Sequence, residues 1–362
     1  MIKNIYGKFK AGALYPLLIS FFLFGCSGSD KNKNNDSDNQ TKNKELVIVS
    51  YGGSYQEAQR KAFFEPFEKK YDVTIYEDSL SGDLSKIKTM ISEGNADWDV
   101  ISLETPLFLE GASQNLFERI DSGLFNPGNF LDGAINDYGI ASCTWSTVLA
   151  YNSDEYGIYH QPQSWADFWN TDQFNGPRSL RNSPVSTLEF ALMADGVSMD
   201  NLYPLDVDRA FKSLDKIKNR VKVWWDDGEQ PIDLLSSGEV AMASAWNGRI
   251  YNARKANKPV KLSWEGGLID MDWWAISKGS ENSELAMKFI EFASEAGQQA
   301  EFSKYIPYGP TNLKALDLIP EEIQKNLPTS PMNLENQVFI NSAWWFENID
   351  SVEVKWNNWM SN

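Results

Sequence analysis

The chain has 362 residues, of which 33 are basic and 50 acidic, and its formal net charge is −17 at pH 7. A surface this acidic repels nucleic acid and anionic lipid and favours cationic ligands, although acidic surfaces also serve solubility. Two Cys and one His exclude a disulfide framework and metal sites built from several Cys or His ligands, and we expect no cofactor.

The N-terminus has the pattern of a secretory signal. Lys3, Lys8 and Lys10 form a positive region, and the mostly apolar residues 11–24 are too few to span a bilayer comfortably. The following Leu-Phe-Gly-Cys tetrad ends at Cys26 and resembles a bacterial lipobox, in which the Cys is lipidated. We therefore expect a signal peptide over residues 1–25 and lipidation of Cys26; the alternative is an ordinary signal with a chance Cys.

A polar segment follows the lipobox. Residues 26–44 contain no aliphatic or aromatic side chain after Cys26, so they cannot offset the entropy of ordering. We expect a disordered tether that holds a globular part, from about Glu45, outside the cytoplasm at the periplasm or cell surface. ATP and NADH are scarce there, which argues against kinases and dehydrogenases.

The globular part opens with a strand, a glycine turn and a helix. Residues 45–50 predict a short buried strand, and Gly52 and Gly53 follow it. Ser54 and Glu57 match a capping box at the start of a helix. Open α/β sheets bind ligands at such turns, because the turns lie at the carboxyl ends of strands.

Strands and helices continue to alternate, and the globular part is long enough for two lobes. The spacing predicts strands over 73–76, 99–102, 241–246 and 272–276, and helices over 84–93, 106–114, 206–218, 232–237 and 284–302. The first part is a βαβαβ unit, which indicates an open and largely parallel sheet.

The chain is rich in aromatic residues, with 14 Trp, 14 Tyr and 20 Phe. Three pairs of Trp occupy positions 224–225, 273–274 and 344–345, and adjacent strand residues face opposite sides. One member of each pair can therefore pack in a core while the other lines a cleft; the alternative is that they are large core residues. His160 lies in a polar stretch and is expected at the surface, whereas Cys143 is expected to be buried and inert.

Several motifs occur together in a fixed order. They are 50–55 (SYGGSY), 98–102 (WDVIS), 164–169 (SWADFW), 238–242 (GEVAM), 246–248 (WNG), 265–267 (EGG) with 270–272 (DMD), and 308–312 (YGPTN). This ordered set resembles extracellular solute-binding proteins of ABC importers, of the spermidine/putrescine type. The similarity extends over nearly the whole chain after the tether.

The resemblance implies an α/β fold of the two-lobed periplasmic-binding-protein type (type 2). Each lobe has an open, mostly parallel sheet flanked by helices, and two hinge crossovers join the lobes. Lobe 1 is expected over 45–145 and 271–318, and lobe 2 over 146–270 and 319–362. The resemblance also implies transport without catalysis, permease subunits as partners and a monomer whose only membrane contact is the lipid anchor.

The resemblance also implies a ligand site lined by aromatic and acidic side chains. Ammonium groups bind carboxylates, and an apolar stem packs between aromatic rings, which add cation–π attraction. The positions that match are Tyr51, Ser54, Tyr55, Glu104, Thr105, Trp246, Asp270, Asp272, Tyr308 and Trp345. We expect a small cationic solute, a polyamine or a related amine.

One part of the family pattern is missing. The second carboxylate cluster of polyamine binders falls at Ser183 and Ser186, which are not acidic. A ligand with one cationic end, or an amine that resembles an amino acid, is therefore an equally good candidate. Arg178 and Arg181 lie nearby, and either would bind a carboxylate if it faced the cleft; the alternative is that both lie on a helix surface.

Two other classes remain open from the residues alone. A cleft rich in Trp and carboxylates is typical of glycosidases and glycan-binding proteins. A surface lipoprotein that binds a protein partner is the third possibility, and a small ligand that raises the melting temperature would argue against it.

Overall fold

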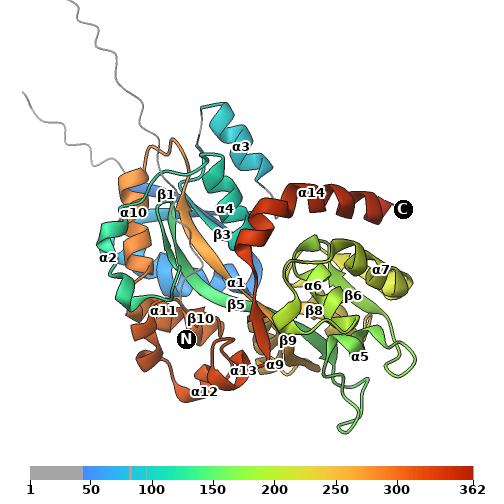
Figure 1. Cartoon of the computed structure of the whole chain (residues 1–362). Coiled ribbons are helices and arrows are strands. Elements are labelled where there is room, and N and C mark those ends of the chain that lie inside the picture. The colour runs from blue at the N-terminus through green and yellow to red at the C-terminus, as the bar shows by residue number, and fades with distance from the viewer. Residues whose placement is uncertain (1–43, 81–83, 95, 362) are drawn as a thin grey trace, which may run out of the picture. The chain divides into compact units, whose positions relative to one another are not determined.

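The computed structural model describes residues 44–80, 84–94 and 96–361 (Figure 1). The expected signal peptide, the expected lipidation site at Cys26 and all of the expected tether except Lys44 lie outside the described residues. Across those described ranges, every helix is too short or too polar to pass through a bilayer.

The first strands form a parallel sheet with helices between them. Strand β1 (Lys44–Ser50) pairs in parallel with β2 (Val73–Ser79) and β3 (Val100–Glu104). The helical segments of this part are α1 (Gly53–Gln59), a π-helical turn (Arg60–Phe64), α2 (Glu65–Tyr71), α3 (Ser85–Ser92) and α4 (Thr105–Ser113). The predicted alternation of strands and helices is confirmed.

The predicted capping box is wrong. Helix α1 begins at Gly53, and within the described residues no side chain caps it. Gly52 and Gly53 have φ values of 61° and 56°, which only glycine adopts at little cost. Gln56, rather than Glu57, reaches back to the Gly52 N–H, and Ser54 bonds to a residue far along the chain.

Two long strands connect the halves of the sheet. Strands β5 (Gly139–Asn152) and β9 (Val260–Ile276) pair antiparallel. The strand order of the sheet is β2-β1-β3-β9-β5-β8-β6-β7, where β6 is Arg178–Arg181, β7 is Val221–Trp225 and β8 is Met242–Trp246. The first part of β5 contributes to a core with β1 and β3, and its last residues pack in two cores that also contain residues of β8. The sequence predicted only the last five residues of β9 and none of β5. Because these two strands pair antiparallel with each other and with β3 and β8, the central part of this mixed sheet is antiparallel.

A second set of parallel strands lies at the far end of β5 and β9 (Figure 1). Strand β6 (Arg178–Arg181) pairs in parallel with β7 (Val221–Trp225) and β8 (Met242–Trp246). The helices of this part are α5 (Trp165–Trp169), α6 (Pro184–Ala194), α7 (Val207–Ile217), α8 (Gln230–Ser236) and α9 (Asn247–Lys255).

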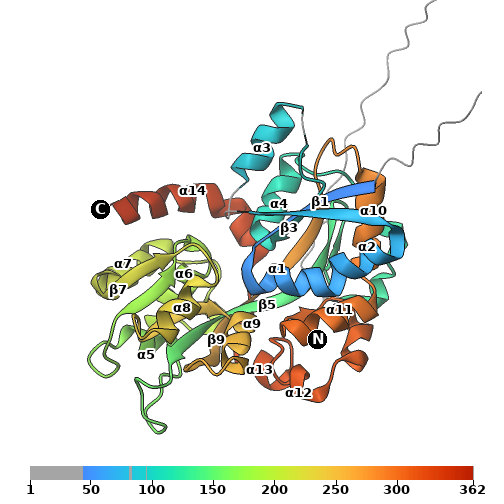
Figure 2. The same ribbon diagram turned by 180° about the vertical axis from the view of Figure 1, so that it is seen from behind.

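The C-terminal third adds helices to both halves. The helix expected over 284–302 is interrupted at Glu295, whose ψ of 142° is extended, so that it forms α10 (Ser283–Ala293) and α11 (Ala296–Tyr305). Helix α11 lies beside α1 (Figure 2), whereas α14 (Ser342–Ser361) lies against α4 and α6. The remaining helices and strands are α12 (Glu321–Gln324), α13 (Pro331–Leu334), β4 (Ile135–Asn136), β10 (Gly309–Pro310) and β11 (Gln337–Phe339).

Short 3-10 segments occur in several connections. They are Ser122–Leu124, Pro127–Asn129, Met199–Asn201, Lys218–Arg220 and Leu313–Leu318. Ile319, Ile323 and Leu327, after the last of these, pack in one small cluster with Ala300 of α11.

Two large apolar cores stabilise the halves. The first core lies around β1, β3 and helices α1, α2 and α10, and includes Ile48, Phe63 and Trp274. The second core lies around β6 and helices α5, α6, α7 and α14, and includes Phe190 and Trp345. Cys143 is buried in the first core and His160 is exposed, as expected.

One carboxyl group is buried inside the second core. Glu189 of α6 accepts hydrogen bonds from Tyr203 Oη at 2.6 Å and from Trp345 Nε1 at 2.7 Å, both on Oε1. Its Oε2 has no partner in the part of the chain that the structure describes. Burial raises the pKa of Glu189 to about 7, so the folded protein favours the neutral acid.

This raised pKa predicts a pH dependence of stability. Because the folded pKa lies above the unfolded value, the contribution of Glu189 is fully present below about pH 4.5. It decreases as the pH rises through about 7. Glu189→Gln keeps the acceptor for Tyr203 and Trp345, so at pH 8 it should be more stable than the native protein by up to roughly 3 kcal/mol. Urea unfolding at pH 5 and pH 8 measures the difference, and an equal effect at both pH values would contradict the ionisation.

Candidate functional site

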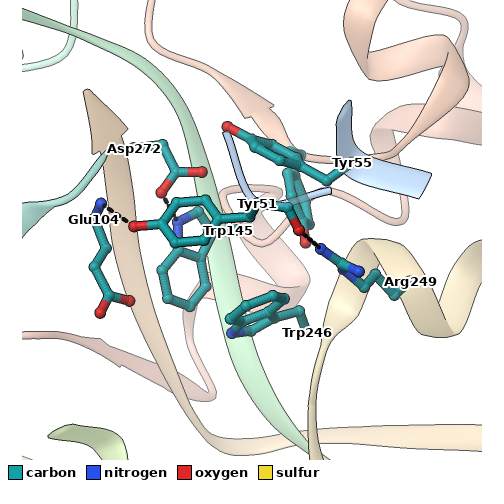
Figure 3. A pocket seen from close by; sticks show the side chains of 8 residues that line it. Tyr51, Tyr55, Glu104, Trp145, Trp246, Arg249 and Asp272 are labelled. Atoms are coloured by element: carbon teal, nitrogen blue, oxygen red, sulfur yellow. Dashed lines mark hydrogen bonds between the residues drawn. The ribbon is translucent and has the colours of Figure 1, made fainter. Parts of the chain in front are cut away.

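The parallel strands of both halves end at one cavity. Tyr51 follows β1, Glu104 ends β3, Trp246 ends β8, and Asp272 lies on β9 between them. The side chains that line the cavity are Tyr51, Tyr55, Glu104, Trp145, Trp246, Arg249, Asp272 and Tyr308 (Figure 3). Carboxyl ends of parallel strands are where open α/β sheets bind ligands.

Two carboxylates lie opposite each other in the sheet register. Glu104 of β3 pairs with Asp272 of β9, and these side chains are only 5% and 4% exposed. Asp272 Oδ1 accepts a hydrogen bond from Trp145 Nε1 at 2.9 Å (Figure 3). Burial, with Glu104 as a lesser cause, raises the pKa of Asp272 to about 7. A cation placed here would restore the charged form.

A third carboxylate lies two residues before Asp272. Asp270 is buried, and its Oδ2 has no hydrogen-bond partner among the described residues. Burial raises its pKa to about 8. Thr105, the first residue of α4, donates to the Met271 carbonyl and accepts from Trp273 Nε1, so it fixes the neighbouring backbone rather than lining the cavity.

Aromatic rings form the walls of the cavity. Trp246 lies 6.3 Å from Tyr51 and 5.6 Å from Trp145, measured between ring centroids, in edge-to-face geometry. Tyr55 and Tyr308 lie 5.6 Å apart on the side of the first core. The Tyr51 hydroxyl accepts from the Glu104 N–H at 3.0 Å. These rings offer π faces and edges to a narrow ligand.

An arginine lies at the other end of the cavity from the carboxylates (Figure 3). Arg249 of α9 donates from Nη1 to Glu229 Oε1 at 3.0 Å and from Nη2 to the Tyr51 carbonyl at 3.3 Å. Its Nε has no partner among the residues described. The same Glu229 oxygen accepts from the Ser54 N–H and hydroxyl at 2.8 and 2.6 Å.

A second arginine pairs with Glu104. Arg181 makes a bidentate ion pair with its carboxylate, with both N–O distances at 3.0 Å. The alternative that the two arginines lie on a helix surface is wrong, because both belong to β6. Arg178 is fully buried and donates to the carbonyls of Phe168, Phe174 and Gly176.

The protein's own side chains fill most of the site. The cavity volume is about 10 Å³, close to the space needed by one water molecule. A ligand larger than water therefore enters only when side chains or whole strands move apart.

The structure brings together part of the expected site. Tyr51, Tyr55, Glu104, Trp246, Asp272 and Tyr308 line the cavity, whereas Ser54, Thr105 and Asp270 contact residues around it. Trp345 lies in the second core, and none of the six tandem Trp residues lines the cavity in the described structure. Ser183 caps α6 through Val185 N, and Ser186 is buried.

Sequence reasoning missed two lining residues. Trp145 lies in β5, whose residues are all buried, so no local pattern singles it out, and its register opposite Asp270 is a long-range feature. Arg249 follows the Trp-Asn-Gly motif on the first turn of α9, at the carboxyl end of β8. A polar residue just after a strand end was the available signal for Arg249.

Comparison with known proteins identifies the family. Residues 62–329 match the family model of bacterial extracellular solute-binding proteins. The chain belongs to this family. A gamma-aminobutyric acid-binding protein of Pseudomonas aeruginosa is 40% identical over 326 residues, which cover 88% of this chain and 92% of that protein.

Two other relatives extend the comparison. The spermidine/putrescine-binding periplasmic protein of Escherichia coli is 24% identical over 277 residues, 74% of this chain and 78% of that protein. The solved structure of the periplasmic binding protein AgtB of A. tumefaciens R10, in complex with agropinic acid, is 38% identical. Its TM-score is 0.82, and the match covers 88% of this chain and 99% of AgtB.

The family assignment fixes the broad function. The chain is the solute-binding protein of an ABC importer and not an enzyme, and it has the two-lobed α/β fold of its neighbours. Its relatives work in the periplasm or outside the cell. The expectation of transport without catalysis is therefore confirmed, and the glycosidase alternative is excluded.

The ion pair in this solute-binding protein predicts strong coupling between two positions. Glu104→Gln leaves the buried Arg181 without a charged partner, so the free energy of unfolding should fall by about 3 kcal/mol. The double variant with Arg181→Gln should recover most of that loss. Denaturant unfolding of the native, single and double variants measures the coupling, and additive losses would contradict a direct ion pair.

Proposed function

We propose that this solute-binding protein captures a small zwitterionic amine, an ω-amino acid such as gamma-aminobutyric acid, and delivers it to the permease. The observation that carries the proposal is the charge arrangement of the cavity, which has carboxylates at one end and Arg249 at the other. A ligand with one ammonium and one carboxylate matches that arrangement. A diamine matches only the acidic end.

The ammonium group belongs at Asp272. This carboxylate is buried, and Tyr51 and Trp246 line the same cavity. An ammonium group there gains an ion pair with Asp272 and cation–π attraction of roughly 0.5–2 kcal/mol per ring. Glu104 lies opposite in register, but Arg181 already compensates its charge. One carboxylate of the pair thus remains for one ammonium.

The carboxylate group belongs at Arg249. Its guanidinium is fully buried, whereas its partner Glu229 is 35% exposed. A ligand carboxylate therefore displaces Glu229 toward water, where that charge is solvated at low cost, and takes over contacts with Arg249 and the Ser54 N–H. The unpartnered Nε of Arg249 offers a further donor.

The comparisons support the same class of ligand. The relative at 40% identity is named for gamma-aminobutyric acid, and the polyamine-binding relative is 24% identical. The neutral Ser183 and Ser186 also support a ligand with one cationic end.

The proposal includes the organisation expected from the sequence. Lobe 1 comprises residues 45–145 and 271–318, and lobe 2 comprises residues 146–270 and 319–362. The packing of Ile319 and Ile323 beside Ala300 favours a C-terminal boundary of lobe 1 somewhat later than residue 318. A monomer anchored through lipidated Cys26, after removal of residues 1–25, presents the site to the permease subunits. The Asp270, Thr105 and Ser54 side chains support the binding residues, and Trp345 supports the second core.

Four ligands with the same carbon spacing test the proposal. Calorimetry with gamma-aminobutyric acid, putrescine, butylamine and butyrate should show that gamma-aminobutyric acid binds at least about tenfold more tightly than the other three, a difference of about 1.4 kcal/mol. Arg249→Gln should bring its affinity close to that of butylamine, because the carboxylate loses its partner. Arg119→Gln removes an exposed arginine and is the control. Equal affinity for butylamine and gamma-aminobutyric acid in the native protein would refute the zwitterion.

Binding should also weaken in acid. The pKa of Asp272 is about 7 in the free protein, and a bound ammonium lowers it, so binding below pH 7 releases a proton. Affinity should therefore be constant above about pH 8 and fall toward tenfold per pH unit below about pH 6. Neither end of gamma-aminobutyric acid titrates in this range.

Asp272→Asn isolates the group responsible for this pH dependence. Measured between pH 5.5 and 8.5, the variant should bind weakly and lose the decrease in affinity below pH 7, leaving only a smaller change near pH 8 from Asp270, whereas the exposed Asp137→Asn should keep the native profile. A native affinity that does not change over this range would argue against Asp272 as the ammonium partner.

A further inference from the structure

Arg181 occupies a place that has the chemistry of a cation site. Its guanidinium binds both oxygens of Glu104 at 3.0 Å. The guanidinium carbon lies 5.5 Å from the ring centroid of Trp246 and 5.9 Å from that of Trp225. The Arg181 side chain is only 11% exposed. A carboxylate flanked by two indole rings is a typical environment for an organic cation.

The strand ends explain why the cation site forms. Arg181, Trp225 and Trp246 are the last residues of the neighbouring strands β6, β7 and β8, and Glu104 is the last residue of β3. Parallel pairing of β6 with β7 and β8 brings the first three together. The arginine therefore reaches across from the second half of the sheet to a carboxylate of the first half.

We propose that Arg181 is the specificity-determining residue that makes this site reject diamines, because its guanidinium permanently fills a second cation subsite beside the ligand cavity. The proposal rests on the proposed function, since it concerns the same site. Arg181 takes the place that a second ammonium would occupy on Glu104. The ligand keeps Asp272 for its single ammonium.

The charges around the cavity support this exclusion. Glu104 and Arg181 compensate each other, as do Glu229 and Arg249, which leaves Asp272 and Asp270. The pKa of Asp270 is raised to about 8 by burial, so it carries little charge at pH 7. A second ammonium would therefore enter a buried region whose remaining acid, Asp270, must first lose its proton, and it would lie close to a fixed guanidinium, both of which are unfavourable.

In the described segment that follows β6, the nearest side chains add no negative charge. Along the segment after β6, Ser183 and Ser186 are neutral. Ser183 Oγ accepts from Val185 N, and Ser186 is buried at the start of α6. The neutral side chains there and the positive Arg181 on the adjacent strand thus act in the same direction.

Two substitutions at one position separate charge from shape. Arg181→Gln removes the positive charge and keeps a long polar side chain, whereas Arg181→Lys keeps the charge. In calorimetry, Arg181→Gln should bind putrescine at least about tenfold more tightly than the native protein does, about 1.4 kcal/mol. Arg181→Lys should keep the bias against putrescine. Arg119→Gln, at an exposed ion pair, is the control for loss of a charge elsewhere.

A guanidinium probe tests the cation subsite without a diamine. Arg181→Ala leaves a space of guanidinium size next to Glu104. Guanidinium chloride at low millimolar concentration should raise the melting temperature of this variant and not that of the native protein, with sodium chloride at equal ionic strength as the control. The added Glu104→Gln change should remove the effect.

The outcomes distinguish this inference from the proposed function. Folded Arg181→Gln that binds putrescine no better than the native protein overturns the inference, even if gamma-aminobutyric acid binds as proposed. Stabilisation of Arg181→Ala by guanidinium supports the subsite, even if the native protein binds none of the four-carbon ligands and the proposed function fails. Absence of that stabilisation in a folded variant overturns the subsite.

Discussion

Three carboxyl groups withdrawn from water, one at the end of β3 and two within β9, determine how this site works. Glu104 and Asp272 face each other across the strand pair, and Asp270 is two residues away. Charges in such a place are costly unless each has a partner. The protein supplies one partner, Arg181, and raised pKa values lessen the charge of the other two acids. The remaining demand for a positive charge is what an amine ligand satisfies.

The residues that line the cavity determine which amine ligands bind. Trp145 holds one oxygen of Asp272, and Tyr51 holds the backbone of Glu104, so the acidic end is positioned before a ligand arrives. At the opposite end, Arg249 is held by the partly exposed carboxylate of Glu229, which water can solvate. Binding thus exchanges the ion pair of Arg249 with Glu229 for one with the ligand carboxylate. The preference among ligands depends on the small difference between the free energies of these interactions and the cost of removing the charged groups from water.

Local patterns in the sequence were sufficient for β1, β2, β3 and β8, for helices such as α3, α4, α7 and α8, and for aromatic and acidic residues near strand ends. They did not predict β5, β6, β7, most of β9, or helices α5, α6, α9 and α14. They were insufficient where distant residues decide the local conformation. Ser54 looked like a helix cap, but Glu229, 175 positions away, takes its hydroxyl. Arg181 was weighed as a residue of a helix surface, yet parallel pairing of a four-residue strand buries it against Glu104. Trp345 was assigned to the ligand through family resemblance, whereas its indole bonds to Glu189 in a core.

Helix α14 has a mechanical consequence for any motion that admits a ligand. It lies against α4, which follows β3, and against α6, which follows β6 (Figure 1). Trp345 ties it to Glu189, and Trp356 Nε1 donates to Asn182 beside α6 at 3.3 Å. Any rotation that separates β3 from β6 therefore has to break or rearrange the contacts of this helix with α4 or with α6. The C-terminal helix is thus a packing constraint on opening that lies far from the cavity residues in the sequence.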